Sequence, residues 1–508
     1  MSADQTVQSN TLVPRPPVVA VVGHIDHGKS TLLDYIRKSN VVAGEAGGIT
    51  QHVSAYEISH TPEDGQVRNI TFIDTPGHEA FQAMRSRGAN ISDVAILVVS
   101  AEEGVKPQTI EAIKSIKDAK VPFVVAINKI DRPNANPEKV KKELSEQEIY
   151  VESYGGNIPS ANISAKTGEG ISELLDLVLL VTDLESLTAN PQTLAAGFIL
   201  ESKLDPKVGA MVTLIIKDGT LHRGDYIGSA GQISKIKKME DFLGRDIAEA
   251  SVSSPVRIYG FSQVPEAGRP FIAFADKKEA DKYSEEFLAN TIKKPALDVS
   301  PSLSSADYLE LPLVVKSDSH GTLEAVLHEI EKIKDDRVRF KIISTGVGTV
   351  TDTDLKILIG SEQPLVVAFN VKIDKSAQDL AERHGVAMQV FNIIYKLTEW
   401  LQEEIKNRRP KITEEVVVAK IKILKIFSQV KDKQVLGGSV QQGTLKKGAV
   451  IKIWRREAEI GKGKVVDLQS QKVAKTEVQE GEQFGAMIES KNTIAEGDKL
   501  EAVEYITR

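Results

Sequence analysis

The chain has 508 residues, more than one hydrophobic core normally organises, and this length predicts about three or four domains. Hydrophobic residues make up 41% of the sequence and charged residues 27%, which excludes wholesale disorder, and the absence of cysteine excludes disulfides and thiolate metal sites. A net charge of −7 argues against a protein that coats nucleic acid.

The amino-terminal residues 1–17 contain neither the apolar core of a signal peptide nor the basic character of a transit peptide. We expect them to form a disordered tail. No stretch of the sequence approaches 18 uninterrupted apolar residues, so we expect no membrane span and a cytoplasmic location.

Between residues 18 and 190, short apolar runs alternate with helical patterns. The runs Val18 to Val22, Ile70 to Ile73, Val94 to Val99 and Pro122 to Ile127 are typical of buried parallel strands. The segment 18–190 is therefore predicted to be one α/β domain.

A phosphate-loop motif follows the first of these runs. Gly23 and Gly28 allow the backbone to approach phosphates closely, Lys29 reaches the β and γ phosphates, and the Ser30 hydroxyl ligates Mg²⁺. A helix is expected to begin directly after the loop. The nucleotide contacts predicted here are Gly23, His24, Ile25, Asp26, His27, Gly28, Lys29, Ser30 and Thr31.

A second motif, Asp-Thr-Pro-Gly-His, follows the second apolar run. The Asp74 carboxylate then lies at the carboxyl end of a strand, where it can hold Mg²⁺ through water. The Gly77 N–H is expected to approach the γ phosphate, and His78 to position the attacking water as the catalytic residue. The predicted contacts are Asp74, Thr75, Pro76, Gly77 and His78.

The third motif, Asn-Lys-Ile-Asp, selects the base. The Asp131 carboxylate can accept hydrogen bonds from the guanine N1–H and amino group, whereas adenine would place an acceptor against it. The motif therefore predicts GTP rather than ATP. The base contacts predicted here are Asn128, Lys129, Ile130, Asp131, Ser164, Ala165 and Lys166.

A glycine-rich segment lies between the first two motifs. It contains Thr50, preceded by two glycines and an isoleucine, and its mobility suits a switch that orders around Mg²⁺ and the γ phosphate. Thr50 is therefore predicted to be a metal ligand together with Ser30 and Asp74.

Beyond residue 190 the pattern changes to short strands with turn residues. Over 195–290 this pattern predicts a β-barrel, with the charged stretch Lys277 to Lys294 as a link to the next module. Residues 305–390 alternate strands and helices and predict a smaller α/β/α domain.

A connecting helix is expected over 391–410. Ile393, Leu397, Leu401 and Ile405 fall on one apolar stripe, and Pro410 ends the helix. The remaining segment, 411–508, returns to short strands and predicts a C-terminal β-barrel.

An internal repeat relates the two predicted barrels. The segment from Gly219 to Gly224 matches that from Gly443 to Gly448, and Pro265 to Gly268 corresponds to Ile494 to Gly497. Glycine beside a polar turn is common, but the order and the spacing of the two matches also agree. We therefore expect two related barrels.

The carboxyl-terminal barrel is basic although the whole chain is acidic. From Pro410 to Arg508 the sequence has 18 Lys plus Arg and 14 Asp plus Glu, so this segment is +4 and the rest of the chain is −11. Such a segment could contact RNA, although a solvated surface often has a charge of this size.

The three nucleotide motifs, taken together, resemble those of the translational GTPases. Narrower features resemble bacterial translation initiation factor two: Glu-Ala-Gly-Gly-Ile-Thr-Gln-His from Glu45, Asp-Thr-Pro-Gly-His-Glu-Ala-Phe from Asp74, and Val-Lys-Ser-Asp-Ser-His-Gly-Thr from Val315. The segment from Ser344 to Asp354 also looks like that family. The resemblance covers nearly everything from Pro17 to Arg508.

The resemblance implies a fold and a function. The fold is a P-loop GTPase domain, a β-barrel, an α/β/α domain, a connecting helix and a C-terminal barrel that binds initiator tRNA. The function is to place formylmethionyl initiator tRNA on the small ribosomal subunit and to promote joining of the large subunit, with GTP hydrolysis releasing the factor. The implied partners are both subunits, their ribosomal RNA and initiator tRNA, with no membrane, for a factor that acts as a monomer.

The resemblance also implies finer roles for residues of the nucleotide site. Lys29, Ser30, Thr50, Asp74 and His78 take the family's roles at the phosphates, and Asn128 and Asp131 its roles at the base. Asp26 would help to coordinate a monovalent cation, and the Ile25 and Ile49 side chains would form an apolar gate beside the attacking water.

Two departures from the family pattern affect what the resemblance implies. Many members have a long amino-terminal region, and we expect the contacts made through it to be missing here. In the C-terminal barrel, the cysteines and the first two basic residues of the family's tRNA-binding segments are replaced, by Gly438 and Phe484 and by Gln469 and Ser470. The residues expected at the tRNA end are Gly438, Lys472, Phe484 and Gly485.

These replacements leave two functions open. One is the initiation factor, with Phe484 either stacking on the terminal base of the tRNA or filling the barrel core. The other is a ribosome-associated GTPase that does not deliver tRNA.

Overall fold

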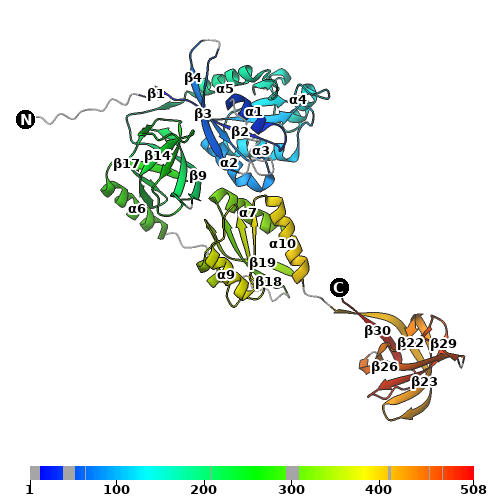
Figure 1. The fold of residues 1–508 in the computed structure, drawn as a ribbon. Coiled ribbons are helices and arrows are strands. Elements are labelled where there is room, and N and C mark those ends of the chain that lie inside the picture. The colour runs from blue at the N-terminus through cyan, green and yellow to red at the C-terminus, as the bar shows by residue number, and fades with distance from the viewer. Residues whose placement is uncertain are drawn as a thin grey trace, which may run out of the picture. The chain divides into compact units, whose positions relative to one another are not determined.

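The computed structural model describes residues 12–37, 52–62, 65–205, 207–292, 308–409, 413–456, 458–471 and 473–507. The chain divides into two compact units, Met1–Asn407 and Arg408–Arg508. The first contains two α/β domains and a barrel, and the second contains another barrel (Figure 1). The expected multidomain α/β and β fold is confirmed.

The first α/β domain is built on a six-stranded sheet in the order β3-β4-β2-β5-β6-β7. Strand β3 runs antiparallel to β4, and the other neighbours are parallel. Every residue of β5 is buried because helices cover both faces of the sheet. The strands are β2 (Val18–Gly23), β3 (Ser54–His60), β4 (Arg68–Asp74), β5 (Val94–Ser100), β6 (Phe123–Asn128) and β7 (Ser160–Asn162).

Helices pack on this sheet in two layers. Helices α1 (Lys29–Arg37) and α5 (Ile171–Glu185) share one apolar core with the sheet, and α3 (Pro107–Ala119) and α4 (Pro137–Glu146) share the other. The short helix η3 (Glu79–Phe81) leads into α2 (Gln82–Ile91), which packs toward the other domains of the first unit. The loops at the carboxyl ends of β2, β4 and β6 contain the three sequence motifs.

Residues 13–17 are part of the fold, which corrects the boundary of the expected tail. Strand β1 (Val13–Pro14) pairs with β8 (Thr188–Ala189), and the Arg15 guanidinium donates two hydrogen bonds of 2.7 Å to Asp93. Lys217 of the first barrel donates to the same carboxylate at 2.7 Å. This buried cluster of Arg15, Asp93 and Lys217 joins the amino-terminal segment, the first domain and the first barrel.

The first barrel has seven strands in the order β13-β12-β17-β9-β10-β16-β14. Only Ile236 and Lys237 separate the two end strands, so the chain itself closes the barrel there. The strands are β9 (Ala196–Asp205), β10 (Gly209–Asp218), β12 (Tyr226–Ser229), β13 (Gln232–Lys235), β14 (Lys238–Asp241), β16 (Pro255–Tyr259) and β17 (Pro270–Phe274), with a separate pair β11 (Leu221–His222) and β15 (Glu249–Ala250).

The charged stretch expected to link the barrel to the next module begins as a helix. Helix α6 (Lys277–Ile292) follows the last strand directly, and the ring of Tyr283 lies 5.5 Å from that of Phe274. The described part of this stretch therefore packs on the barrel that it follows.

The second α/β domain has a parallel sheet in the order β19-β18-β20-β21. Helices α7 and α10 pack on one face and α8 and α9 on the other, which gives three layers. The elements are β18 (Leu309–Ser317), α7 (His320–Lys332), β19 (Val338–Val347), α8 (Asp352–Lys356), β20 (Leu365–Phe369), α9 (Lys375–His384), β21 (Ala387–Phe391) and α10 (Ile394–Arg408).

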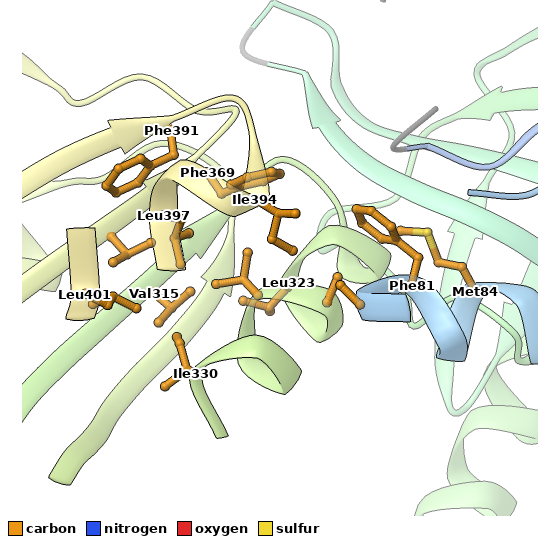
Figure 2. Close-up of a cluster of buried hydrophobic side chains, with 14 of the residues drawn as sticks. Phe81, Met84, Val315, Leu323, Ile330, Phe369, Phe391, Ile394, Leu397 and Leu401 are labelled. Carbon is orange, nitrogen blue, oxygen red and sulfur yellow. The ribbon is translucent and has the colours of Figure 1, made fainter. Parts of the chain in front are cut away.

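Helix α10 corresponds to the expected connecting helix, but it packs along the sheet of the second α/β domain. Its buried stripe begins at Ile394 and continues through Leu397, Leu401 and Ile405, whereas Ile393 lies before the first turn and is only half-buried. The same core reaches Phe81 and Met84 of the first domain (Figure 2). Among the described residues, no helix is long and apolar enough to cross a membrane.

The second barrel has seven strands in the order β25-β30-β22-β23-β29-β26-β27, and an additional pairing of β25 with β26 closes it. Its core includes Ile421, Leu436, Leu468 and Phe484. The strands are β22 (Thr413–Val430), β23 (Lys433–Gly443), β25 (Val450–Arg455), β26 (Ala458–Ser470), β27 (Val473–Ala474), β29 (Gln483–Ser490) and β30 (Lys499–Thr507), with a pair β24 (Leu445–Lys446) and β28 (Glu477–Val478).

Candidate functional site

A cavity of about 410 Å³ lies at the carboxyl ends of β2 and β6. Three loops that are distant in the sequence converge on it: the phosphate loop, the loop after β6 and the loop after β7. Its lining residues are Asp26, Gly28, Lys29, Ser30, Thr31, Asn128, Lys129, Asp131, Arg132, Ala165 and Lys166. Ten of these eleven were predicted nucleotide contacts, and only Arg132 was not.

The phosphate loop depends on its two glycines. Gly23 has a φ of 149° and Gly28 a φ of 89°, in the region that favours glycine. A Cβ on Gly23 would collide with the Val98 carbonyl, and one on Gly28 with the Asn128 side chain. Both positions therefore exclude any side chain, which leaves room for the backbone to approach a phosphate closely at the start of α1.

The Lys29 side chain is buried beneath the loop, and its Nζ donates to the His24 carbonyl at 2.6 Å. Burial lowers the pKa of Lys29 to about 8, although the nearby Asp74 carboxylate favours the charged form of the lysine. Phosphate groups in the cavity would restore the full positive charge. Burial also lowers the pKa of His27 to about 3, so this ring is neutral.

The base end of the cavity is organised by Asn128. Its Nδ2 donates to the His27 carbonyl at 2.8 Å, and its Oδ1 accepts from the Ala165 N–H at 2.9 Å. The Ser164 hydroxyl donates to the Asp131 Oδ1 at 2.8 Å, which lowers the pKa of Asp131. The carboxylate is thus ionised and oriented, as an acceptor for two guanine donors requires.

The Asp74 to His78 loop does not line the cavity. The Thr75 hydroxyl donates to the Val21 carbonyl at 2.9 Å, which joins the loop to the strand that precedes the phosphate loop. A Cβ on Gly77 would lie 2.5 Å from the Lys29 Nζ, so the two loops approach each other closely at this glycine. Asp74 and Ser30 supply a carboxylate and a hydroxyl near Lys29, and such oxygen ligands fit Mg²⁺.

His78 lies apart from the cavity, at the start of η3. Its Nδ1 accepts the Ala80 N–H at 2.9 Å, and its ring contacts Phe81 and Tyr395 edge to face. Burial lowers the pKa of His78, which favours the neutral ring with its proton on Nε2.

Sequence reasoning missed the buried cation that holds this loop. The Arg85 guanidinium donates to the carbonyls of Pro76, Gly77 and His78, and it pairs with Glu111 at 2.9 Å. Its fully buried side chain lies on the apolar face of α2. The signal available in the sequence was an arginine beside Met84, at a position that the helical pattern assigns to the core.

The remaining predicted residues divide into three groups. Gly23, His24, Ile25, His27, Ile130 and Ser164 belong to the loops that form the cavity but do not line it. Thr50 and Lys472 lie outside the described residues. In the second barrel, Phe484 is only 5% exposed and its ring packs against Gly438, whereas Gly485 faces outward. Phe484 therefore fills the core and offers no surface for stacking in this arrangement.

Comparisons with known proteins agree with this geometry. The family model for the elongation factor Tu GTP binding domain matches residues 15–183, and that for elongation factor G domain 2 matches 194–274. The model for translation-initiation factor 2 matches residues 288–402.

The curated relatives match along nearly the whole chain. Translation initiation factor IF-2 of Bacillus licheniformis is 42% identical over 496 residues, covering 96% of this chain and 68% of the relative. The chain belongs to the translation initiation factor IF-2 family. The IF-2 of Rubrobacter xylanophilus is 40% identical, covering 97% of this chain and 72% of the relative. Among solved structures, GDP-bound aIF5B from Aeropyrum pernix is 28% identical, covering 96% of this chain and 92% of that chain, with a TM-score of 0.46.

Membership of the IF-2 family gives the chain its activity. The chain is a translation initiation GTPase, and it hydrolyses GTP in the elongation factor Tu-type domain. The predicted guanine-nucleotide chemistry and the predicted family are therefore confirmed.

Proposed function

We propose that this IF-2 family member places formylmethionyl initiator tRNA on the small ribosomal subunit, promotes joining of the large subunit, and leaves after GTP hydrolysis. The observation that best supports tRNA delivery is an open row of residues on the outer face of the second barrel. Strand pairing aligns Lys425 with Gly437, Gly437 with Gly485, and Gly485 with Gln469.

We propose that the nucleotide site uses the predicted residues in separate roles. Lys29 and the loop N–H groups hold the phosphates, and Asp131 reads the base with support from Asn128 and Ser164. Ser30, Asp74 and Thr50 are the proposed Mg²⁺ ligands, and the metal would neutralise phosphate charge there. His78 is proposed to orient the attacking water once it reaches the γ phosphate.

The two central residues of the row, Gly437 and Gly485, form a floor without side chains. Neither central residue has a Cβ, and a Cβ on Gly485 would meet nothing within 4 Å. Phe427 lies at one border, 63% exposed, and a Cβ on Gly437 would lie 3.0 Å from its ring. The partly buried Val435 and Met487 lie on the same face, because they pair with each other two residues along their strands from Gly437 and Gly485.

These groups match the end of an aminoacylated tRNA. The apolar border formed by Phe427, Val435 and Met487 suits a base or a methionyl side chain, because both are flat or flexible apolar groups. Lys425 and Lys422 are exposed on the adjacent strand and can contact phosphates. Phe427, rather than the buried Phe484, is the aromatic residue that we propose for stacking.

Direct binding tests this proposal. The full chain with a non-hydrolysable GTP analogue should bind formylmethionyl-tRNA more tightly than uncharged tRNA, measured by filter binding. Phe427→Ala should weaken binding of the charged tRNA about tenfold, because base stacking contributes about 1–3 kcal/mol. Val430→Ala is the matched control, since Val430 is another exposed apolar residue of β22 and lies outside the row.

One observation favours the alternative, a ribosome-associated GTPase that does not deliver tRNA. The family's basic residues are replaced in β26 by Gln469 and by Ser470, whose hydroxyl donates to the Gln483 carbonyl inside the barrel. If charged and uncharged tRNA bind equally weakly while ribosomal subunits are retained, this alternative is correct.

A further inference from the structure

The residue after the Asp-Thr-Pro-Gly turn is held by another domain. The His78 ring lies 4.6 Å from the Tyr395 ring, centroid to centroid, at an interplanar angle of 64°. Tyr395 belongs to the first turn of α10 in the second α/β domain. Such an edge-to-face pair favours one orientation of the smaller ring.

The contact is part of a larger interface between the two domains. Phe81 and Met84 point toward the second α/β domain and share a core with Leu323 and Ile394 (Figure 2). Met84 packs on Gly321, where a Cβ would collide with its terminal methyl. The first turn of α10 is therefore fixed next to the His78 loop by apolar packing.

Two ion pairs border this apolar contact. Lys332 of α7 donates to Glu79 at 2.6 Å, and Arg87 of α2 donates to Glu324 at 2.8 Å. Glu79 directly follows His78, so one of the pairs holds the histidine's own loop against the second α/β domain. A movement of α7 and α10 would be transmitted to His78.

We propose that Tyr395 is a positioning residue that keeps His78 away from the nucleotide cavity until α10 moves. His78 does not line the cavity, and its ring contacts Tyr395 of the second α/β domain and Phe81, which belongs to the core shared with that domain. GTP hydrolysis is thereby slow while the two domains are packed together. This inference rests on the proposed role of His78 in orienting water.

Hydrolysis of GTP by the full chain without ribosomes tests the proposal. Tyr395→Ala should raise kcat about two- to tenfold, the bias that an edge-to-face contact provides, with an unchanged KM for GTP. Tyr395→Phe keeps the ring and should behave as the parent chain. Lys396→Ala, at the neighbouring exposed position of α10, is the matched control. Tyr395 is 49% exposed, so its truncation leaves no buried cavity.

Two further measurements show whether the effect passes through His78. The gain from Tyr395→Ala should vanish when His78→Ala is also present. The NMR signal of the His78 ring Hε1 should shift in Tyr395→Ala and stay unchanged in Tyr395→Phe, because the tyrosine ring current acts on it.

Three results would overturn the proposal: an unchanged kcat in Tyr395→Ala, a gain that persists without His78, or a gain in Tyr395→Phe equal to that in Tyr395→Ala. Ribosome-stimulated hydrolysis by His78→Ala separates this from the proposed function. If that rate equals the parent rate, the role of His78 is wrong. If it falls while Tyr395→Ala has no effect, only the inference about Tyr395 is wrong.

Discussion

The two barrels have corresponding strands in the same order, but their equivalent faces are used differently. In the first barrel, strand pairing aligns Glu201, Thr213, Arg257 and Glu240 in one row. The equivalent row of the second barrel is Lys425, Gly437, Gly485 and Gln469.

Residues of the other two domains of the first unit lie at the row of the first barrel. Glu201 is buried, and its carboxylate lies 3.5 Å from the Nδ1 of His52, which follows the proposed switch segment. The other ring nitrogen of His52 lies 3.4 Å from Asp318, just before α7. Three domains thus meet at this row.

The second barrel's row has small or exposed residues at the same positions. Two glycines replace Thr213 and Arg257, and an exposed lysine replaces the buried Glu201. A face that joins domains within the chain in one barrel is therefore available to a partner molecule in the other. Four predictions test this comparison of the two barrels.

The largest expected effect concerns the attachment of the first barrel. Asp93→Asn leaves Arg15 and Lys217 as buried cations without their carboxylate, which should cost about 3–5 kcal/mol of unfolding free energy. Urea denaturation followed by circular dichroism measures this loss. Asp467→Asn in the second barrel removes the exposed ion pair with Lys447 and should leave the urea midpoint unchanged. Equal losses of stability in the two variants would contradict the view that a buried ion-pair cluster stabilises the first barrel's attachment while the exposed pair of the second barrel contributes little.

The next effect concerns the open row. Gly485→Leu should weaken binding of formylmethionyl-tRNA at least tenfold, because a side chain would occupy the floor where the tRNA end is proposed to lie. Gly485 has no neighbour within 4 Å of an added Cβ, so the melting temperature should stay unchanged. A variant that binds the tRNA normally would place the contact elsewhere on the barrel.

A smaller effect is expected on acidification. Burial opposes ionisation of Asp93, but the hydrogen bond from Arg15 and the charge of Lys217 outweigh it and lower its pKa. Because the folded pKa lies below the unfolded value of 3.8, the stabilisation is complete above about pH 4 and is lost as the pH falls further. The difference in urea midpoint between the parent chain and Asp93→Asn should therefore be constant from pH 6 to about pH 4 and begin to narrow toward pH 3. A difference that stays constant down to pH 3 would show that Asp93 is not the titrating group.

The smallest effect tests the similarity of the barrels. Gly224 and Gly448 occupy equivalent turns with φ of 101° and 89°, and a Cβ at either would meet nothing within 4 Å. Alanine at each should cost about 1–2 kcal/mol from backbone strain alone. Thermal unfolding of the two variants should give shifts that agree within about 0.5 kcal/mol. A marked inequality would mean that the two turns are not equivalent.

The sequence was sufficient for features that depend on local backbone chemistry. The glycines of the phosphate loop and of the repeated turns have the positive φ values that their motifs require. Gly219 and Gly443 both face a carbonyl, that of Leu194 in one barrel and of Val418 in the other. Such constraints are short in range, so a single sequence reveals them.

Features that depend on long-range packing were not predictable in the same way. The ion pair of Arg15 with Asp93 spans distant segments, and residues 13–17 therefore looked like a tail. The pairing of His78 with Tyr395 joins two domains whose packing no motif specifies. Phe484 was left open between core and surface because an aromatic residue suits both, and only the register of β29 places it inside.

The bonds of Asn128 have a consequence for amide hydrogen exchange. The Ala165 N–H donates a hydrogen bond to Asn128 Oδ1, and the Nδ2 of the same side chain donates one to the His27 carbonyl. Because one buried carboxamide makes both bonds, opening the phosphate loop frees it to rotate and exposes the Ala165 amide. Deuterium uptake at the Ala165 amide, at the base end of the cavity, therefore measures how often the phosphate loop opens in the nucleotide-free protein.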